Sequence, residues 1–211
     1  MAQYTVNFKN NTESVWTMGL YQLIPSNADL DSVSWLQTTA PPYGNGSPPV
    51  SWDSTYDVVL GSYSQQECTD CYHVSQIFQC ELGTSWDIIF KDNVKQLVQS
   101  GVVRSDHLVI NNKSGLVASP GIGMSGCASV YRNTVLSGAS TLFVANPSYW
   151  VGLFNKLSPG DVIADNMVAG PLQLNFSTNI TQALLTANTD GQVLGLDLSY
   201  GITTGKDFIV R

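Results

Sequence analysis

Hydrophobic and polar residues alternate along most of the chain with the two-residue period of a β-strand. Near the start, Tyr4, Val6 and Phe8 are separated by single polar residues. Trp16, Met18 and Leu20 are spaced in the same way. Because successive side chains of a strand point to opposite faces, each run predicts a strand with one buried face.

The same pattern recurs toward the C-terminus and predicts the fold class. Further β-rich runs lie at 52–60, 72–80, 86–90, 107–110, 141–145, 149–154 and 172–176. Asp190-Gly191 between two apolar runs indicates a tight hairpin. No repeat of 20 to 50 residues is visible. We therefore expect one all-β domain over residues 1–211, an antiparallel β-sandwich.

One short helix is predicted at residues 92–101. Asp92 or Asn93 is a suitable N-cap, and Leu97 falls at helical spacing from the preceding apolar position. Gly101 stands where a left-handed residue commonly ends a helix.

Composition excludes several classes of partner. Only 12% of residues are charged, and the formal net charge is -7 with nine Lys and Arg. Such a chain lacks the positive surface that neutralises nucleic-acid phosphates. No apolar run approaches the roughly 18 residues of a membrane span. The N-terminus has no basic or apolar leader, so we expect no signal peptide and a cytoplasmic or non-classically released protein.

The cysteines are Cys68, Cys71, Cys80 and Cys127, and in a reducing compartment we expect free thiols. Only Cys68 and Cys71 have the spacing of zinc ligands, and they lack a second closely spaced pair. No structural zinc is expected.

Two further motifs have simple structural interpretations. The glycines of 121–126 match a dinucleotide fingerprint, but the βαβ context is missing, which favours a flexible glycine loop. Asn-x-Ser/Thr sequons are expected to serve as turns; they start at Asn10, Asn45, Asn112, Asn175 and Asn179.

A catalytic triad would need His73 or His107, and no Gly-x-Ser-x-Gly elbow accompanies them. We therefore do not expect an enzyme. Acidic pairs offer hard oxygen ligands for Ca²⁺ or Mg²⁺, or alternatively act as turn caps. These pairs are Asp29 with Asp31, Asp161 with Asp165, and Asp53 with Asp57.

Aromatic residues around a loop rich in proline and glycine are the best candidates for a binding site. Trp35, Tyr43 and Trp52 bracket this loop, and Tyr56 and Met18 are candidate wall residues on neighbouring strands. Aromatics with few charges suit an apolar pocket at one end of a sandwich. The alternative is that these residues form the core.

The N-terminal third also carries a resemblance to a known family. The residues that carry it are Tyr4-Thr-Val, Asn10-Asn-Thr, Leu20-Tyr-Gln, Pro25, Val33-Ser-Trp-Leu, Trp52 and Tyr56, with Tyr149-Trp-Val and Gly160-Asp-Val-Ile later on. In this respect the chain resembles the RhiA-type proteins, bacterial and fungal β-proteins named for a quorum-regulated rhizosphere protein. The resemblance is strongest over 3–60, so the cysteine-bearing middle is interpreted as an elaboration particular to this protein.

That resemblance implies a β-fold but assigns no catalytic residues. A second resemblance is to the pink chromoproteins of fungal fruit bodies, which implies a small apolar pigment held without a covalent bond. We expect a non-enzymatic carrier of a small apolar ligand, with a lectin-like or toxin-like surface interaction protein as the alternative. A homodimer is also considered among its partners.

Overall fold

The computed structural model describes residues 3–23, 29–46, 48–65, 70–144, 148–163, 166–177, 179–204 and 207–210, with side chains described up to residue 201. These residues form 18 strands and no helix. The all-β fold class predicted from the sequence is therefore confirmed. Helices long and apolar enough to cross a membrane are absent from the described residues.

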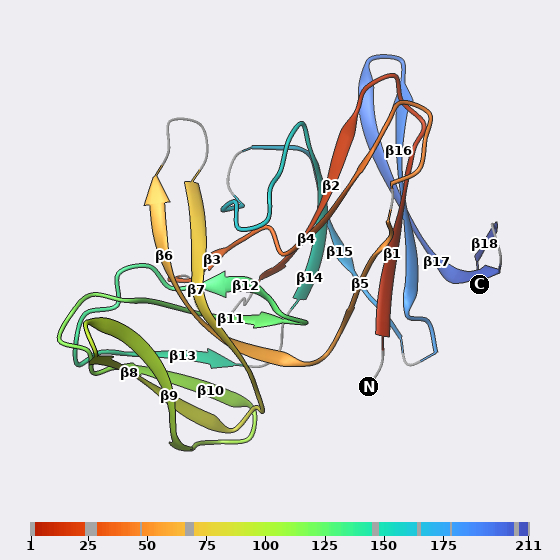
Figure 1. The fold of residues 1–211 in the computed structure, drawn as a ribbon. Coiled ribbons are helices and arrows are strands. Elements are labelled where there is room, and N and C mark those ends of the chain that lie inside the picture. The colour runs from red at the N-terminus through yellow and green to blue at the C-terminus, as the bar shows by residue number, and fades with distance from the viewer. Residues whose placement is uncertain are drawn as a thin grey trace.

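Strands from both ends of the chain form a first sandwich, which we call lobe 1 (Figure 1). They are β1 (Gln3–Asn10), β2 (Trp16–Leu23), β4 (Leu36–Ala40), β5 (Val50–Asp53), β14 (Ser148–Phe154), β15 (Met167–Leu174), β16 (Gln182–Asp190), β17 (Val193–Thr204) and β18 (Asp207–Val210). One sheet has the order β18-β17-β16-β1-β5, and the other has the order β15-β14-β2-β4.

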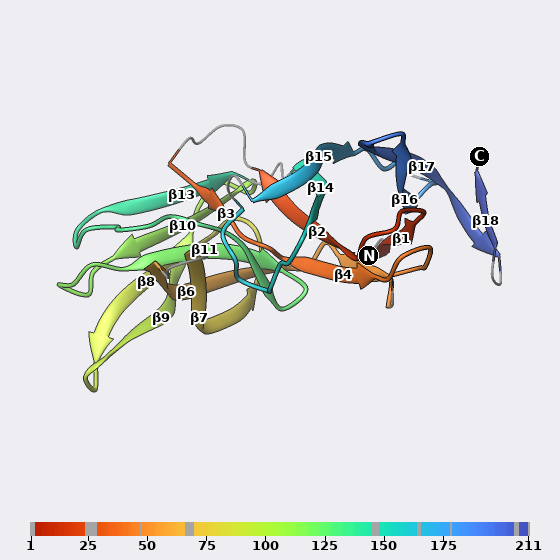
Figure 2. The ribbon, with the colours of Figure 1, turned by 90° about the horizontal axis from the view of Figure 1, so that it is seen from above.

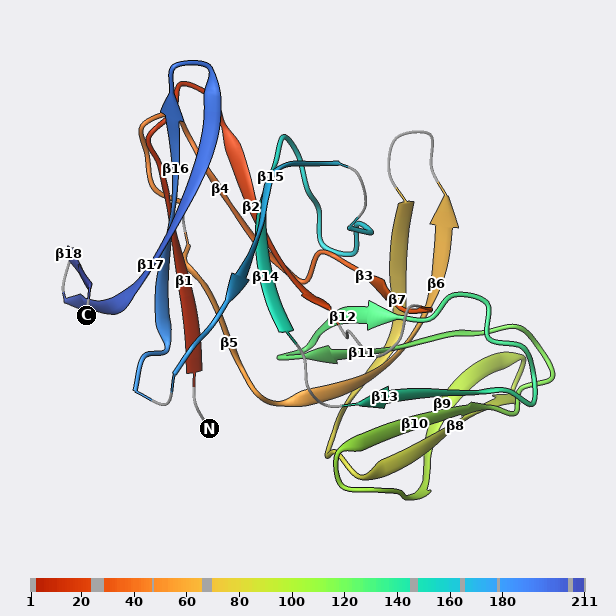
Figure 3. The same ribbon diagram turned by 180° about the vertical axis from the view of Figure 1, so that it is seen from behind.

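The middle of the chain forms a second sandwich, lobe 2, at the other end of the molecule (Figures 2 and 3). Its strands are β6 (Tyr56–Gln65), β7 (Asp70–Cys80), β8 (Thr84–Lys91), β9 (Val94–Val102), β10 (His107–Asn112), β11 (Ser119–Met124), β12 (Cys127–Tyr131) and β13 (Ser140–Val144). The sheets are β13-β10-β8-β9 and β3-β12-β11-β6-β7, where β3 (Asp31–Ser32) is an added edge strand.

Alternation along the strands places a hydrophobic core inside each lobe. In lobe 1, Val6 and Phe8 of β1 pack with Leu20 of β2, all at most 2% exposed. In lobe 2, Ile110 of β10 packs in the same way with Leu60 of β6. Burying such a side chain fully contributes about 1.5–3 kcal/mol, so these one-sided strands hold the facing sheets together.

The two lobes repeat one strand arrangement. β1 pairs in parallel with β16 and antiparallel with β5, just as β10 pairs in parallel with β8 and antiparallel with β13. β2 lies between β4 and β14, just as β11 lies between β12 and β6. The repeats are β1–β9 and β10–β17, so each lobe combines the first half of one repeat with the second half of the other.

A buried asparagine closes the loop after the first strand of the first repeat. The Asn10 side chain is fully buried. Its Oδ1 accepts from the Thr12 backbone N–H at 3.0 Å and from the Thr12 hydroxyl at 2.8 Å. Its Nδ2 donates to the carbonyls of Ser14 at 2.7 Å and Pro41 at 2.9 Å.

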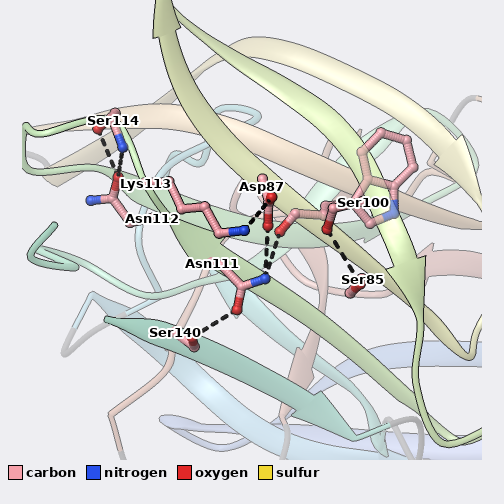
Figure 4. A network of polar contacts seen from close by, with 9 residues as sticks. Ser85, Asp87, Ser100, Asn111, Asn112, Lys113, Ser114 and Ser140 are labelled. Atoms are coloured by element: carbon pink, nitrogen blue, oxygen red, sulfur yellow. Dashed lines mark hydrogen bonds and ion pairs between the residues drawn. The ribbon is translucent and has the colours of Figure 1, made fainter. Parts of the chain in front are cut away.

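Asn112 does the same in the second repeat. Its Oδ1 accepts from the backbone N–H and hydroxyl of Ser114 at 3.2 and 2.7 Å (Figure 4). Its Nδ2 donates to the carbonyls of Leu116 and Val135 at 2.7 and 2.8 Å. The expected use of these two sequons as turns is confirmed, because each asparagine Oδ1 accepts from the backbone N–H two residues further on.

Equivalent residues of the two repeats touch where the lobes meet. Gln22 lies opposite Tyr149 in β14, and Met124 lies opposite Tyr56 in β6. The Gln22 Nε2 donates to the Met124 sulfur at 2.8 Å. A pseudo-twofold axis therefore passes between these two residues, and Met124 belongs to the core of lobe 1 although β11 is part of lobe 2.

The helix predicted at 92–101 is wrong. Asp92 and Asn93 have φ angles of 52° and 62°, which give a two-residue hairpin turn with positive φ at both central positions. Beyond the turn, Leu97 faces Ile88 across the β8–β9 ladder and is buried, whereas Val98 is 43% exposed. The apolar spacing that predicted a helix therefore belongs to a strand.

The glycine-rich stretch 121–126 is also not a flexible loop. It forms the end of β11 and the turn into β12, where Ser125 and Gly126 have φ of 54° and 80°. A Cβ on Gly123 would lie 2.0 Å from the Cys127 carbonyl oxygen, so the close approach of the two strands requires glycine. The predicted hairpin at Asp190 is confirmed, with Gly191 in its turn between β16 and β17.

Candidate functional site

Four of the five residues predicted to form a pocket come together in the core of lobe 1. Trp35 and Trp52 are each 2% exposed, and their rings meet edge to face with centroids 5.4 Å apart. Met18 is fully buried in the same core, and Tyr56 packs against its edge. The predicted aromatic cluster is therefore mainly a packing unit.

Tyr43 lies away from this cluster. It is 69% exposed in the loop between β4 and β5, with φ of 52°. Its hydroxyl donates to the Glu13 carboxylate at 3.3 Å. The structure therefore does not bring Tyr43 to the tryptophans.

An apolar hollow of about 280 Å³ lies between the two lobes, and we call it the interlobe pocket. Its lining residues are Ser34, Trp35, Tyr72, His73, Val74, Ile77, Gly126, Cys127, Ala128, Pro159 and Gly160. Trp35 belongs to the core of lobe 1, whereas Tyr72 and Ala128 belong to a small cluster on the outer face of a lobe 2 sheet. Both lobes thus contribute walls.

Two long connections of lobe 1 build one side of the interlobe pocket. The connection from β2 to β4 carries Ser34 and Trp35, and the connection from β14 to β15 carries Pro159 and Gly160. Their counterparts in lobe 2 are the β11–β12 turn at 125–126 and the short β6–β7 connection. The pocket therefore lies where lobe 1 departs from the repeat.

Hydrogen bonds hold these connections to each other and against lobe 2. The Tyr72 N–H donates to the Gly160 carbonyl at 2.8 Å, and the Ser34 N–H donates to the Asp161 carbonyl at 2.7 Å. The Trp35 indole N–H donates to the Met124 carbonyl at 2.9 Å. Trp35 is thereby fixed as a rigid part of the pocket wall.

Most polar groups of the interlobe pocket are hydrogen-bonded within the protein or carry no charge. Burial raises the pKa values of the Tyr72 hydroxyl and the Cys127 thiol, so both stay protonated at neutral pH. The Tyr72 hydroxyl donates to the Ser119 carbonyl at 2.7 Å. His73 contacts the Ser64 hydroxyl at 3.0 Å. An apolar ligand would thus meet little unpaired polarity here.

The acidic residues considered for a cation are spread over separate contacts. Asp29 pairs with Arg132 at 3.2 Å. Asp161 accepts from the Cys71 thiol at 3.2 Å and from the Ser158 N–H at 2.7 Å. Burial raises the pKa of Asp31 and so disfavours the ionised carboxylate that would bind a cation.

No three His, Cys, Asp or Glu side chains of the described residues lie close enough together to share a metal ion. Asp53 and Asp57 flank the β11–β12 turn, where Asp57 accepts from the Gly126 N–H at 2.7 Å. Asp165 and Cys68 lie outside the described residues. A Ca²⁺ or Mg²⁺ site at these aspartates stays a prediction.

The two histidines have different partners on different strands. His73 contacts Ser64, whereas His107 Nδ1 lies 2.5 Å from Asp106 Oδ1. Within the described part of the chain, neither histidine joins a serine to a carboxylate.

The outer sheet of lobe 2 carries a polar network on its surface (Figure 4). Lys113 and Asn111 donate to Asp87 at 2.6 and 2.8 Å, and Ser140 donates to Asn111 at 2.7 Å. Burial acts to raise the pKa of Asp87, but hydrogen bonds from Lys113, Asn111 and Ser100 and the charge of Lys113 outweigh it and hold that pKa below its usual value. The groups satisfy one another, so the network stabilises the sheet.

Comparison with known families matches the chain to RhiA over residues 1–195. The chain belongs to the RhiA family. No curated protein and no solved structure matches it.

The extent of the RhiA match corrects one expectation. The cysteine-bearing middle was interpreted as an elaboration of this protein, but it lies within the matched residues. It forms lobe 2, which repeats the arrangement of lobe 1. The middle is thus an integral part of the RhiA fold in this chain.

Sequence reasoning missed most of the interlobe pocket. Tyr72 carried a usable signal, because it lies on the apolar side of a predicted strand. Ala128 and Gly126 carried none, because small residues of a hairpin become pocket walls only when distant segments pack beside them.

Proposed function

We propose that this RhiA-family protein binds a small apolar molecule in the interlobe pocket and holds it without changing it chemically. The observation that carries the proposal is that two long connections of lobe 1 depart from the internal repeat, and both line this one pocket. Ligand pockets commonly lie between packed units and are lined mainly by apolar and aromatic side chains.

The lining favours a compact, largely apolar ligand. Trp35 and Tyr72 offer ring surfaces, and Val74 and Ile77 add aliphatic surface at the rim. A volume of about 280 Å³ lies just below the usual range for small-molecule sites, which suits a small ligand. A small conjugated pigment is one ligand class of this description. Ser34 and His73 are the polar groups available to orient it.

A rim substitution tests the site directly. Val74 is 44% exposed and lines the pocket, so Val74→Trp fills it with little effect on folding. Val98 is 43% exposed on β9 and is not part of the pocket lining, which makes Val98→Trp a matched control. With Nile red as an apolar fluorescent probe, we expect at least tenfold weaker binding for Val74→Trp, which is about 1.4 kcal/mol.

The dye titration has clear opposing outcomes. Wild type and Val98→Trp should bind Nile red equally, with equal thermal midpoints for all three proteins. Equal binding by Val74→Trp would show that the dye binds elsewhere, and absence of saturable binding by the wild type would reject the pocket as an apolar site.

A further inference from the structure

Each lobe also has a cavity at one edge. It lies near the end of β15 in lobe 1 and near the end of β7 in lobe 2. The cavity of lobe 1 measures about 290 Å³ and that of lobe 2 about 500 Å³. We call them the end cavities. The first is lined by Tyr4, Ser148, Tyr149, Gln173, Leu174, Asn175 and Phe176. The second is lined by Gln79, Cys80, Glu81, Thr84, Trp86 and Gln99.

The two end cavities share one wall that is equivalent in the two repeats. Leu174 of β15 lies opposite Tyr149, and Cys80 of β7 lies opposite Tyr56. Tyr149 and Tyr56 in turn lie opposite Gln22 and Met124, the equivalent residues at the pseudo-twofold axis. Residues 173–175 of one cavity therefore correspond to residues 79–81 of the other, whereas the remaining walls come from different positions in the two repeats.

Both cavities combine aromatic rings with free amide side chains. In lobe 1, Tyr4 packs on Phe176 with ring centroids 5.0 Å apart. In lobe 2, Trp86 lines the cavity but is only 7% exposed, and the adjoining Phe78, which is 44% exposed, stacks on it at 6.0 Å and an interplanar angle of 15°. Gln173 lines the first cavity and Gln79 the second, and neither side-chain amide has a hydrogen-bond partner among the residues that the structure describes.

This lining determines the class of ligand. An amide offers a donor and an acceptor together, as does a sugar hydroxyl. Aromatic rings add apolar surface for the C–H faces of a sugar ring. No Lys or Arg lines either cavity, and the chain carries a net charge of -7, which disfavours anionic ligands.

We propose that each end cavity binds a neutral saccharide, so that one chain carries two glycan sites. The proposal rests on the repeat and on the linings of the end cavities, and it does not depend on the interlobe pocket. Two sites on separate lobes allow one chain to cross-link two glycans, which strengthens binding to a glycan-coated surface through avidity.

Binding to an array of immobilised neutral oligosaccharides is the first test. The wild type should bind at least one glycan of the array, and calorimetry with that free oligosaccharide should give two sites per chain. Beads coated with the same oligosaccharide should agglutinate. Absence of binding to every neutral glycan would overturn the proposal.

Variants then assign the sites. Gln79 and Gln173 are exposed, so Gln79→Leu and Gln173→Leu are expected to fold normally, with thermal midpoints as the check. Each should reduce the stoichiometry from two to one and abolish agglutination, and the double variant should lose glycan binding. Gln192→Leu, in the exposed β16–β17 turn, is the matched control and should behave as wild type.

Other outcomes contradict the proposal. A stoichiometry of one in the wild type, or glycan binding that survives in the folded double variant, would place the site elsewhere. Val74→Trp should leave glycan binding unchanged, so a failure of the interlobe pocket and a failure of the end cavities can be told apart.

Discussion

Replacement of Trp52 by alanine is expected to lower the free energy of unfolding by about 3–5 kcal/mol, the usual cost of removing a large aromatic side chain from a core. Trp52 is 2% exposed, and its ring lies 5.3–5.7 Å from those of Tyr4, Trp35, Tyr149 and Phe176. Alanine would leave a cavity at the centre of lobe 1. Urea unfolding followed by circular dichroism measures the change.

Trp150 provides the control for this substitution. It lies on β14 in the facing sheet and is only half-buried, and within the described residues neither its indole N–H nor that of Trp52 has a hydrogen-bond partner, so burial is what separates the two side chains. Trp150→Ala should therefore cost less than half as much as Trp52→Ala. Equal losses for the two variants would contradict the assignment of Trp52 to the centre of the core.

Replacement of Asn112 or Asn10 by alanine is expected to cost about 2–4 kcal/mol each. Each substitution removes at least four hydrogen bonds and leaves buried carbonyl and N–H groups without partners, which is more costly than the loss of one exposed bond. The two loops share no hydrogen-bond partners, so the losses should add in the double variant.

Asn7→Ala is the matched control for the loop asparagines. Asn7 lies on the same strand as Asn10, is half-buried, and donates one long hydrogen bond of 3.5 Å to the Ala183 carbonyl. We expect a loss of less than about 1 kcal/mol. If Asn10→Ala and Asn112→Ala cost no more than Asn7→Ala, the paired loops do not stabilise the repeat.

The strands themselves could be predicted from the sequence because burial follows local alternation. Val6, Phe8 and Leu20 are in the core as their two-residue spacing predicts. The helix at 92–101 failed because a short apolar spacing fits both a helix and an amphipathic strand. Positive φ angles at Asp92 and Asn93 place a hairpin turn here instead of a helix start. The sequence signal for that turn is the tendency of Asp and Asn to form hairpin turns.

The internal repeat was invisible in the sequence because its two copies preserve the burial pattern more than residue identity. Asn10 and Asn112 are the same residue in equivalent loops, but Phe8 corresponds to Ile110 and Gln22 to Met124. The two halves of each lobe also come from different repeats, so residues distant in the sequence meet in one core. Only the pairing of strands shows the equivalence.

The candidate site was predictable only in part for the same reason. Trp35 was predicted and lines the interlobe pocket. Trp52 and Met18 were predicted with it, and they fill the core beside it. Tyr43 was selected because its loop adjoins the tryptophans in sequence, but in the structure its ring lies on the surface. Pocket walls formed by Tyr72 and Ala128 depend on the packing of two lobes, which local patterns do not encode.

The most direct test of the proposed ligand site is a crystal structure of the protein soaked with bromobenzene, in which the bromine is located by anomalous scattering. We expect a bromine peak inside the interlobe pocket, between Trp35, Tyr72 and Ala128, and no such peak in Val74→Trp crystals. A bromine peak confined to the end cavities or elsewhere, or no peak at saturating bromobenzene, would contradict the proposal that the interlobe pocket binds small apolar molecules.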